Sequence, residues 1–177
     1  MATRLDMKTY ERDYFEYLFP MAYPNTNKKV EHFIRDEMIP NGDITIESLA
    51  ETAFSQMTGI KKISTIGKDF VNGMDMKKAT AFVNPNRPRV EARITSFQAK
   101  VGSLITLVYE PFTKKFYWFK FPSSFYRLMK TVTVYFDLDG TPRTKSIRAD
   151  GKAGKLNAWN YCIHQPAKGK NYVKRIA

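Results

Sequence analysis

The feature that most constrains the fold of this chain is an Asn72-Gly73 pair set between two stretches of strand-like composition, Lys61–Phe70 and Met74–Val83. Asn-Gly is typical of tight hairpin turns, because both residues accept a positive φ at little cost. The stretches on either side carry the apolar and β-branched residues that strands favour. The sequence therefore predicts a β-hairpin that turns at Asn72-Gly73.

The register of this hairpin decides what its charged residues can do. With a three-residue loop, Phe70 pairs with Met74 and Asp69 with Asp75, and such cross-strand partners lie about 5 Å apart on one face. Lys77, two residues further on, projects from that same face. Two carboxylates this close repel each other unless a cation lies between them, and Mg²⁺ takes oxygen ligands of this kind. A two-residue loop instead turns Asp69 to the opposite face, and both registers are open.

An aspartate, a short spacer and then Asp-x-Lys on a strand resembles the metal-binding signature of the PD-(D/E)xK nuclease superfamily. The resemblance implies that Asp69 and Asp75 hold Mg²⁺, with Mn²⁺ as a substitute, and that Lys77 polarises the attacking water or the phosphate. Many members place a further acidic residue on the preceding helix, which corresponds to Glu47. Two departures are present: Lys68 stands where the signature has proline, and the spacer of five residues is short.

Apolar residues at helical spacing predict helices ahead of the hairpin, over 7–19, over 26–38, and along a stripe at 46–57 that ends at Gly59. Pro20 is expected to end the first of these helices. Asn41-Gly42-Asp43 offers the N-cap of the third. Along that helix, Glu47 falls at the edge of the apolar stripe, and Glu51 is expected further toward solvent.

Short apolar runs and alternating apolar residues predict strands in the later part of the chain. They are expected at 104–109, 116–121, 132–136 and 158–163, with a loop at 84–88, a turn at 111–114, and a short helix from Ser123-Ser124 to Met129. Residues 89–95 alternate as a strand would, although the apolar spacing between 90 and 101 also fits a helix. Both interpretations of that segment remain open.

These elements predict one α/β domain over 1–177, in which the N-terminal helices pack on a mixed central β-sheet. The length and the 43% hydrophobic content suit a single globular domain with a full core. The resemblance implies that the sheet is a restriction-endonuclease-like core. A basic C-terminal segment is expected from about residue 149.

Positive charge is concentrated in the later two thirds of the chain. Residues 1–60 hold 6 basic and 10 acidic side chains, whereas 61–142 hold 14 and 6, and 143–177 hold 9 and 1. This asymmetry is typical of proteins that bind the phosphate backbone of nucleic acids, and DNA is the expected partner with RNA as the alternative. The residues nominated to contact phosphates are Arg87, Arg89, Arg93, Lys100, Arg127 and Lys130.

Two further patterns resemble motifs of proteins that act on or bind phosphate, and each is better explained as a turn or loop. VYFDLDGT at 134–141 resembles the nucleophile motif of haloacid-dehalogenase phosphatases, but only 36 residues follow it, and Asp139-Gly140 reads as a hairpin turn. The stretch from Gly151 to Lys155 has its glycines too close for a phosphate-binding loop, and Leu156 replaces the required hydroxyl.

The remaining composition bounds where and how the protein works. No apolar run is long enough to span a bilayer and no signal-peptide pattern opens the chain, so a cytoplasmic protein is expected. Cys162 is the single cysteine, so any metal is expected to be bound by oxygen. The predicted function is a Mg²⁺-dependent DNA endonuclease, expected as a homodimer. The alternative is a non-catalytic nucleic-acid-binding or inhibitory protein.

Overall fold

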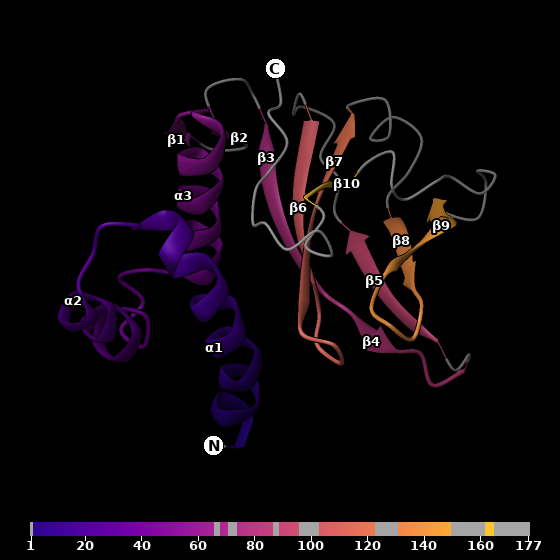
Figure 1. Cartoon of the computed structure of the whole chain (residues 1–177), viewed down its shortest axis with the longest axis horizontal. Helices are drawn as coiled ribbons and strands as arrows, with labels where there is room; N and C mark the ends of the chain where they lie inside the picture. The colour runs from indigo at the N-terminus through magenta and orange to yellow at the C-terminus, as the bar shows by residue number, and fades with distance from the viewer. Residues whose placement is uncertain are drawn as a thin grey trace. The chain divides into compact units, whose positions relative to one another are not determined.

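The computed structural model describes residues 2–65, 68–70, 74–86, 89–95, 103–122, 131–149 and 162–164, and the side chains of 10–63, 70, 74–86, 89–94, 104–121 and 132–143. Helices come first in the chain and β-sheets follow, so the predicted mixed α/β class is confirmed (Figure 1). The chain divides into two compact units, Met1–Lys62 and, apart from the last residues, Ile63–Arg175. No described helix is both long and apolar enough to cross a membrane.

The first unit consists of helices. They are α1 (Ala2–Ala22), α2 (Lys28–Phe33), the π-helix η1 (Ile34–Met38) and α3 (Ile46–Thr58). The prediction that Pro20 ends the first helix is wrong, because α1 continues to Ala22. A proline this close to the C-terminal end removes one backbone hydrogen bond while the last turn keeps others, such as the one from Tyr23 N to Phe19 O (2.9 Å). The second predicted helix is present but widens into η1.

Helix α3 has clear signals at both ends. Its N-cap is Thr45 rather than the predicted Asn41-Gly42-Asp43, because Thr45 and Ser48 form a reciprocal capping box. Gly59 ends the helix with φ 77°, as predicted. The predicted order of its acidic residues is wrong: Glu47 is exposed, whereas Glu51 is half-buried and lies 3.7 Å from Lys62 Nζ. This ion pair holds the Glu51 side chain against the protein.

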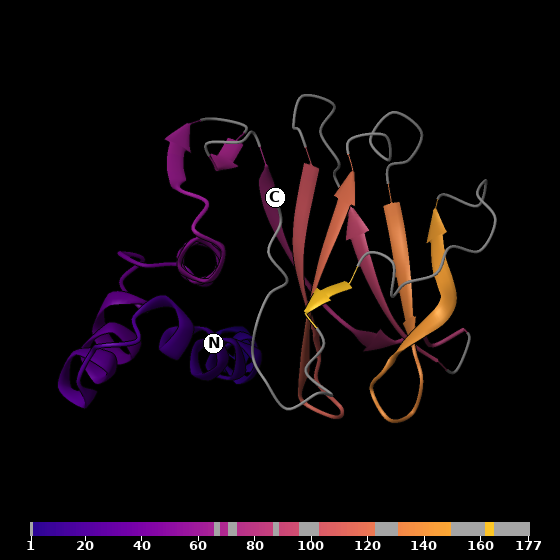
Figure 2. The ribbon, with the colours of Figure 1, turned by 45° about the horizontal axis from the view of Figure 1, so that its top comes forward.

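The second unit carries the sheets. Strands β10 (Cys162–His164), β7 (Lys115–Pro122), β6 (Ser103–Glu110) and β3 (Asp75–Thr80) form a mixed sheet in that order. Strands β4 (Phe82–Val83), β5 (Val90–Thr95), β8 (Thr131–Phe136) and β9 (Pro142–Ala149) form an antiparallel sheet (Figure 2). The chain passes from the mixed to the antiparallel sheet at Ala81, whose N–H still donates to Tyr109 O (2.8 Å).

The predicted hairpin between 61–70 and 74–83 has a different pairing. The first stretch forms two short strands, β1 (Lys62–Thr65) and β2 (Lys68–Phe70), which pair with each other. Strand β3 instead pairs in parallel with β6, so that Asp75 lies opposite Leu104 and Lys77 opposite Thr106. Such a pair needs a long crossover connection, which β4 and β5 supply here.

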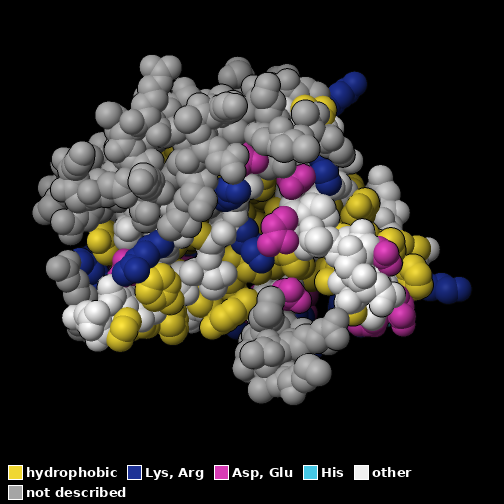
Figure 3. Space-filling model, turned by 180° about the vertical axis from the view of Figure 1, so that it is seen from behind, with side chains coloured by type: hydrophobic (Ala, Val, Ile, Leu, Met, Phe, Trp, Pro, Cys, Tyr) yellow, Lys and Arg dark blue, Asp and Glu magenta, His cyan; other side chains and the backbone are white. Residues whose placement is uncertain are grey.

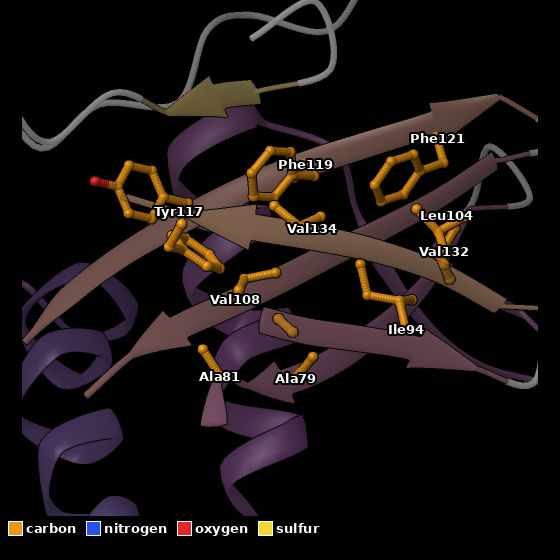
Figure 4. Close-up of a cluster of buried hydrophobic side chains, with 12 residues drawn as sticks. Ala79, Ala81, Ile94, Leu104, Val108, Tyr117, Phe119, Phe121, Val132 and Val134 are labelled. Carbon is orange, nitrogen blue, oxygen red and sulfur yellow. The ribbon is translucent and has the colours of Figure 1, made fainter. Parts of the chain in front are cut away.

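The main core lies between the two sheets. Each sheet contributes one face, called the inner face here, and the side chains of the two inner faces point toward one another (Figure 4). The buried residues of this cluster are Ala79, Ala81, Ala92, Ile94, Leu104, Val108, Tyr117, Phe119, Phe121, Val132, Val134 and Phe136. The opposite face of each sheet is its outer face. The open question over 89–95 is thereby settled as strand β5, because Ala92 and Ile94 are inner-face residues.

Two turns pack against each other at one end of the second unit. In the turn between β6 and β7, the buried Glu110 carboxylate accepts hydrogen bonds from the N–H groups of Phe112 (2.8 Å) and Thr113 (2.9 Å). In the turn between β8 and β9, Gly140 has φ 81°, and its carbonyl accepts a bond from Tyr117 Oη (2.8 Å). The predicted turns at 111–114 and Asp139-Gly140 are both confirmed.

Several predictions fall partly or wholly on residues that the structure does not describe. These are the helix over 123–129, the segment 96–101, the strand over 158–163 except its last two residues, and the basic tail. The last two residues of that predicted strand lie in β10.

Candidate active site

Asp75 and Lys77 share the inner face of β3. They alternate with Met76 and Lys78, and the inner-face Ala79 follows at the same two-residue spacing. Lys77 Nζ lies 3.7 Å from Asp75 Oδ2, and the two side chains are 38% and 13% exposed. A carboxylate that is largely enclosed and a neighbouring ammonium thus lie at the start of a strand that contributes Ala79 to the core. Lys78 points to the outer face, as the predicted alternation requires.

Thr106 brings a buried hydroxyl to the same inner face. It lies opposite Lys77 on the neighbouring strand β6 and is fully buried. Its Oγ1 has no hydrogen-bond partner among the described residues. An unpaired buried hydroxyl costs about 1–3 kcal/mol, so a threonine retained here in place of valine is unusual. The three polar side chains Asp75, Lys77 and Thr106 therefore lie on the same sheet face as the apolar residues Ala79, Leu104 and Val108.

The predicted pairing of Asp69 with Asp75 stays a prediction. Phe70 N–H donates to Met74 O (3.2 Å), which is the contact that a three-residue loop would make. The loop 71–73 and the Asp69 side chain lie outside what the structure describes. Glu47 belongs to the first unit, on the exposed side of α3, and its role as a further ligand also stays a prediction.

The chemistry of the described donors fits a hard divalent cation. Asp75 supplies carboxylate oxygens, and Thr106 supplies a hydroxyl oxygen without a described partner. Over the residues that the structure describes, no three His, Cys, Asp or Glu side chains gather into one cluster. Mg²⁺ commonly takes only one or two carboxylates and completes its shell with water and substrate phosphate oxygens. One enclosed carboxylate, with Asp69 as the expected second, suits such a site.

The two predicted phosphate-binding residues whose side chains the structure describes, Arg89 and Arg93, do not share the face of Asp75 and Lys77. Arg89 and Arg93 alternate with the inner-face Ala92 and Ile94 along β5, so they lie on the outer face of the antiparallel sheet. The other residues predicted to contact phosphates fall outside the described side chains; these are Arg87, Lys100, Arg127 and Lys130. Arg89 and Arg93 therefore lie on a surface separate from the β3 site.

The DxDGT-like stretch is used for a turn. Asp137 pairs with Arg143 (3.0 Å), and Asp137 N–H donates to Thr141 O (2.8 Å). The pKa of Asp139 is lowered chiefly by the hydrogen bond from the Thr141 backbone N–H (2.9 Å). Both carboxylates are exposed and engaged with their own hairpin, which supports the turn interpretation of this motif.

Sequence reasoning missed Thr106 and the aromatic partners of Arg89 and Arg93. A lone threonine within an apolar strand carries no signal of its own, because threonine is common in strands. The position becomes notable only once β6 is known to pair with β3. For the arginines, alternation with Val90, Ala92 and Ile94 was the available signal that they face away from the core.

No protein-family model, curated protein or solved structure matches this chain. Its functional assignment therefore rests on the geometry of β3 and on the chemistry of the side chains around it.

Proposed function

We propose that this chain hydrolyses phosphodiester bonds in DNA at the inner face of β3. The observation that carries the proposal is the Asp75–Lys77 pair, with the two groups 3.7 Å apart at the start of a strand that contributes Ala79 to the core. Enclosing a carboxylate costs free energy, and the neighbouring ammonium offsets part of that cost. The excess of positive charge over 61–177 favours a polyanionic substrate.

Each residue of the site has a distinct role in this proposal. Asp75, together with Asp69, holds Mg²⁺ or Mn²⁺, and a bound ion of this kind lowers the pKa of its water and neutralises phosphate charge. Lys77 orients the attacking water and stabilises negative charge that develops on the phosphate. Thr106 places its buried hydroxyl opposite Lys77, where it supports the position of the site's polar groups.

The restriction-endonuclease-like core belongs to the same proposal. Its support is the order of elements, in which helix α3 precedes β1 and β2 and these precede the Asp75-x-Lys77 strand. The expected homodimer would supply two such sites for the two strands of a duplex.

The proposal is tested by cleavage assays on purified protein. Wild-type protein with Mg²⁺ or Mn²⁺ is expected to cut DNA, and EDTA is expected to stop the reaction. Asp75→Ala should abolish cleavage yet leave DNA affinity unchanged or raised, because removing negative charge does not weaken attraction to phosphate. Affinity is measured by gel shift in the same buffer without metal.

A matched control for Asp75 is Asp137→Ala, which removes an exposed carboxylate from the β8–β9 turn. This variant should cleave like wild type. Loss of cleavage in both variants, or its retention in Asp75→Ala, contradicts the assignment. A wild-type protein that cuts neither DNA nor RNA favours the alternative of a non-catalytic binding protein.

Replacing Thr106 by valine separates a role in the site from a role in the core. Valine keeps the shape and removes a hydroxyl without a described partner, so the free energy of unfolding should stay unchanged or rise by about 1 kcal/mol. Cleavage should fall about tenfold, the size of one lost hydrogen bond of about 1.4 kcal/mol. Thr106→Ser keeps the hydroxyl and should retain more activity despite lower stability. Parallel loss of stability and activity in Thr106→Val would show a purely structural role.

A further inference from the structure

The outer face of the antiparallel sheet carries two arginine–aromatic pairs. The Arg89 guanidinium lies 4.2 Å from the centre of the Tyr135 ring, and that of Arg93 lies 5.2 Å from the centre of the Phe82 ring. Phe82, Glu91 and Tyr135 lie opposite one another in a row across β4, β5 and β8. These residues, Phe82, Arg89, Glu91, Arg93 and Tyr135, are called the arginine–aromatic patch below.

A buried carboxylate organises this patch. Glu91 is 3% exposed, and its oxygens accept hydrogen bonds from Asn84 Nδ2 (2.5 Å) and Arg93 Nε (3.4 Å). The contact with Arg93 engages Nε at the base of the guanidinium, so the planar head is directed over Phe82. Arg89 Nε has no hydrogen-bond acceptor among the described residues. Stacking on the Tyr135 ring therefore positions the Arg89 guanidinium. The patch is thus preorganised before any ligand arrives.

Part of the patch is accessible at the surface. The Arg93 side chain is 50% exposed and Phe82 is 37% exposed, which is high for a phenylalanine within a sheet. Figure 3 shows that Lys and Arg side chains lie beside hydrophobic side chains on the surface seen from behind. A charged plane resting on an exposed ring offers both a flat stacking surface and a positive charge.

We infer that the arginine–aromatic patch binds single-stranded nucleic acid. Aromatic rings and guanidinium planes stack on the faces of bases, and bases expose those faces in a single strand but not within a duplex. The net charge of +12 supplies the attraction for the phosphate backbone, which an apolar protein partner would not require. The inference goes beyond the proposed cleavage activity, since it requires neither a metal ion nor the β3 site.

Fluorescence anisotropy in EDTA tests this binding separately from cleavage. The probe is labelled oligodeoxythymidylate of about 15 nucleotides, a length within the range that one single-strand-binding fold covers. Wild-type protein should bind this strand more tightly than a duplex of equal length. Phe82→Ala should weaken binding about tenfold, the expected loss for one stacked base. Phe82→Leu should weaken it similarly, because leucine keeps bulk on the strand but has no ring.

Arginine variants separate stacking from charge. Arg93→Lys keeps the positive charge, so affinity should fall several-fold while the slope of affinity against salt concentration is unchanged. Arg143→Ala is the charge control, because its side chain is similarly exposed (46%) but pairs with Asp137 in the β8–β9 turn. Val83→Ala is the apolar control, since Val83 is 48% exposed on the same short strand and adjacent to Phe82. Both controls should bind nearly as wild type does.

Three outcomes would overturn the inference. The first is binding of the duplex that equals or exceeds binding of the single strand. The second is an equal loss of affinity in Phe82→Ala and Val83→Ala. The third is wild-type affinity in Arg93→Lys and in both Phe82 variants. Circular dichroism of each variant confirms that the fold is intact. Failure of this binding leaves the cleavage proposal standing, and failure of cleavage leaves this inference standing, because the two use different residues and different assays.

Discussion

Lys77→Met is expected to lower the rate of DNA cleavage by about a hundredfold or more, as happens when a positioned acid-base or electrostatic group is removed. Methionine retains most of the length and packing of the lysine stem while deleting the charge that lies 3.7 Å from Asp75 Oδ2. The variant should still bind DNA and Mg²⁺, because the other basic residues of 61–177 and the carboxylate oxygens of Asp75 remain. Single-turnover cleavage with Mg²⁺ in excess measures the effect on the chemical step.

Lys78→Met is the matched control for this prediction. Lys78 follows Lys77 directly and lies opposite Leu107, so its side chain leaves the other face of the same strand. The substitution removes the same charge from the same short strand, and cleavage should stay within a few-fold of wild type. Equal losses in the two variants would mean that the inner face of β3 is not an active site. Unchanged cleavage in Lys77→Met would remove the lysine from the mechanism.

Gly140→Ala is expected to destabilise the protein by about 2–5 kcal/mol. Its φ of 81° lies in the left-handed region, which costs a residue with a Cβ about 1–2 kcal/mol. A Cβ at this position would also overlap Thr113 Oγ1 and come within 2.8 Å of Glu110 Oε2. The overlap forces apart the two packed turns and threatens the bond from Tyr117 Oη to the Gly140 carbonyl, at a further cost of about 1–3 kcal/mol. Urea denaturation followed by circular dichroism measures the change.

Gly42→Ala isolates the backbone part of that effect. Gly42 has nearly the same φ, 82°, and an added Cβ there meets no atom within 4 Å. Its substitution should therefore cost only about 1–2 kcal/mol. Within the second unit, Thr113→Ala removes the hydroxyl that a Cβ on residue 140 would overlap. Gly140→Ala should therefore cost less stability in the Thr113→Ala protein than in the wild type. A Gly140→Ala variant no less stable than Gly42→Ala would show that the two turns are not tightly packed.

Much of the local structure was predictable because it depends on neighbours in the sequence. The apolar stripe and Gly59 located α3, since helical spacing and a left-handed C-terminal residue are local properties. Apolar runs located β6 and β7, alternation located β8, and Asp139-Gly140 located a turn. Local rules competed at the N-cap of α3, where the Thr45–Ser48 capping box prevailed over Asn41-Gly42-Asp43.

The candidate site was predictable only in part. The two-residue spacing of Asp75 and Lys77 placed them on one strand face, and the structure brings them to 3.7 Å. Their strand partner was not predictable, because an Asn-Gly turn favours a local hairpin whereas β3 pairs in parallel with β6, about thirty residues away in sequence.

The sequence by itself determined where α3 and the strands β6, β7 and β8 lie, where the turns at 111–114 and Asp139-Gly140 fall, and that Asp75 and Lys77 share a face, because each follows from short-range periodicity and backbone preference. Only the tertiary structure decided that 89–95 includes strand β5, that β3 lies beside β6, that Thr106 faces the core with no hydrogen-bond partner among the described residues, and that Arg89 and Arg93 stack on rings from β8 and β4. Those contacts join residues distant in the chain, and they form because burying the inner faces of two sheets fixes which strands are neighbours.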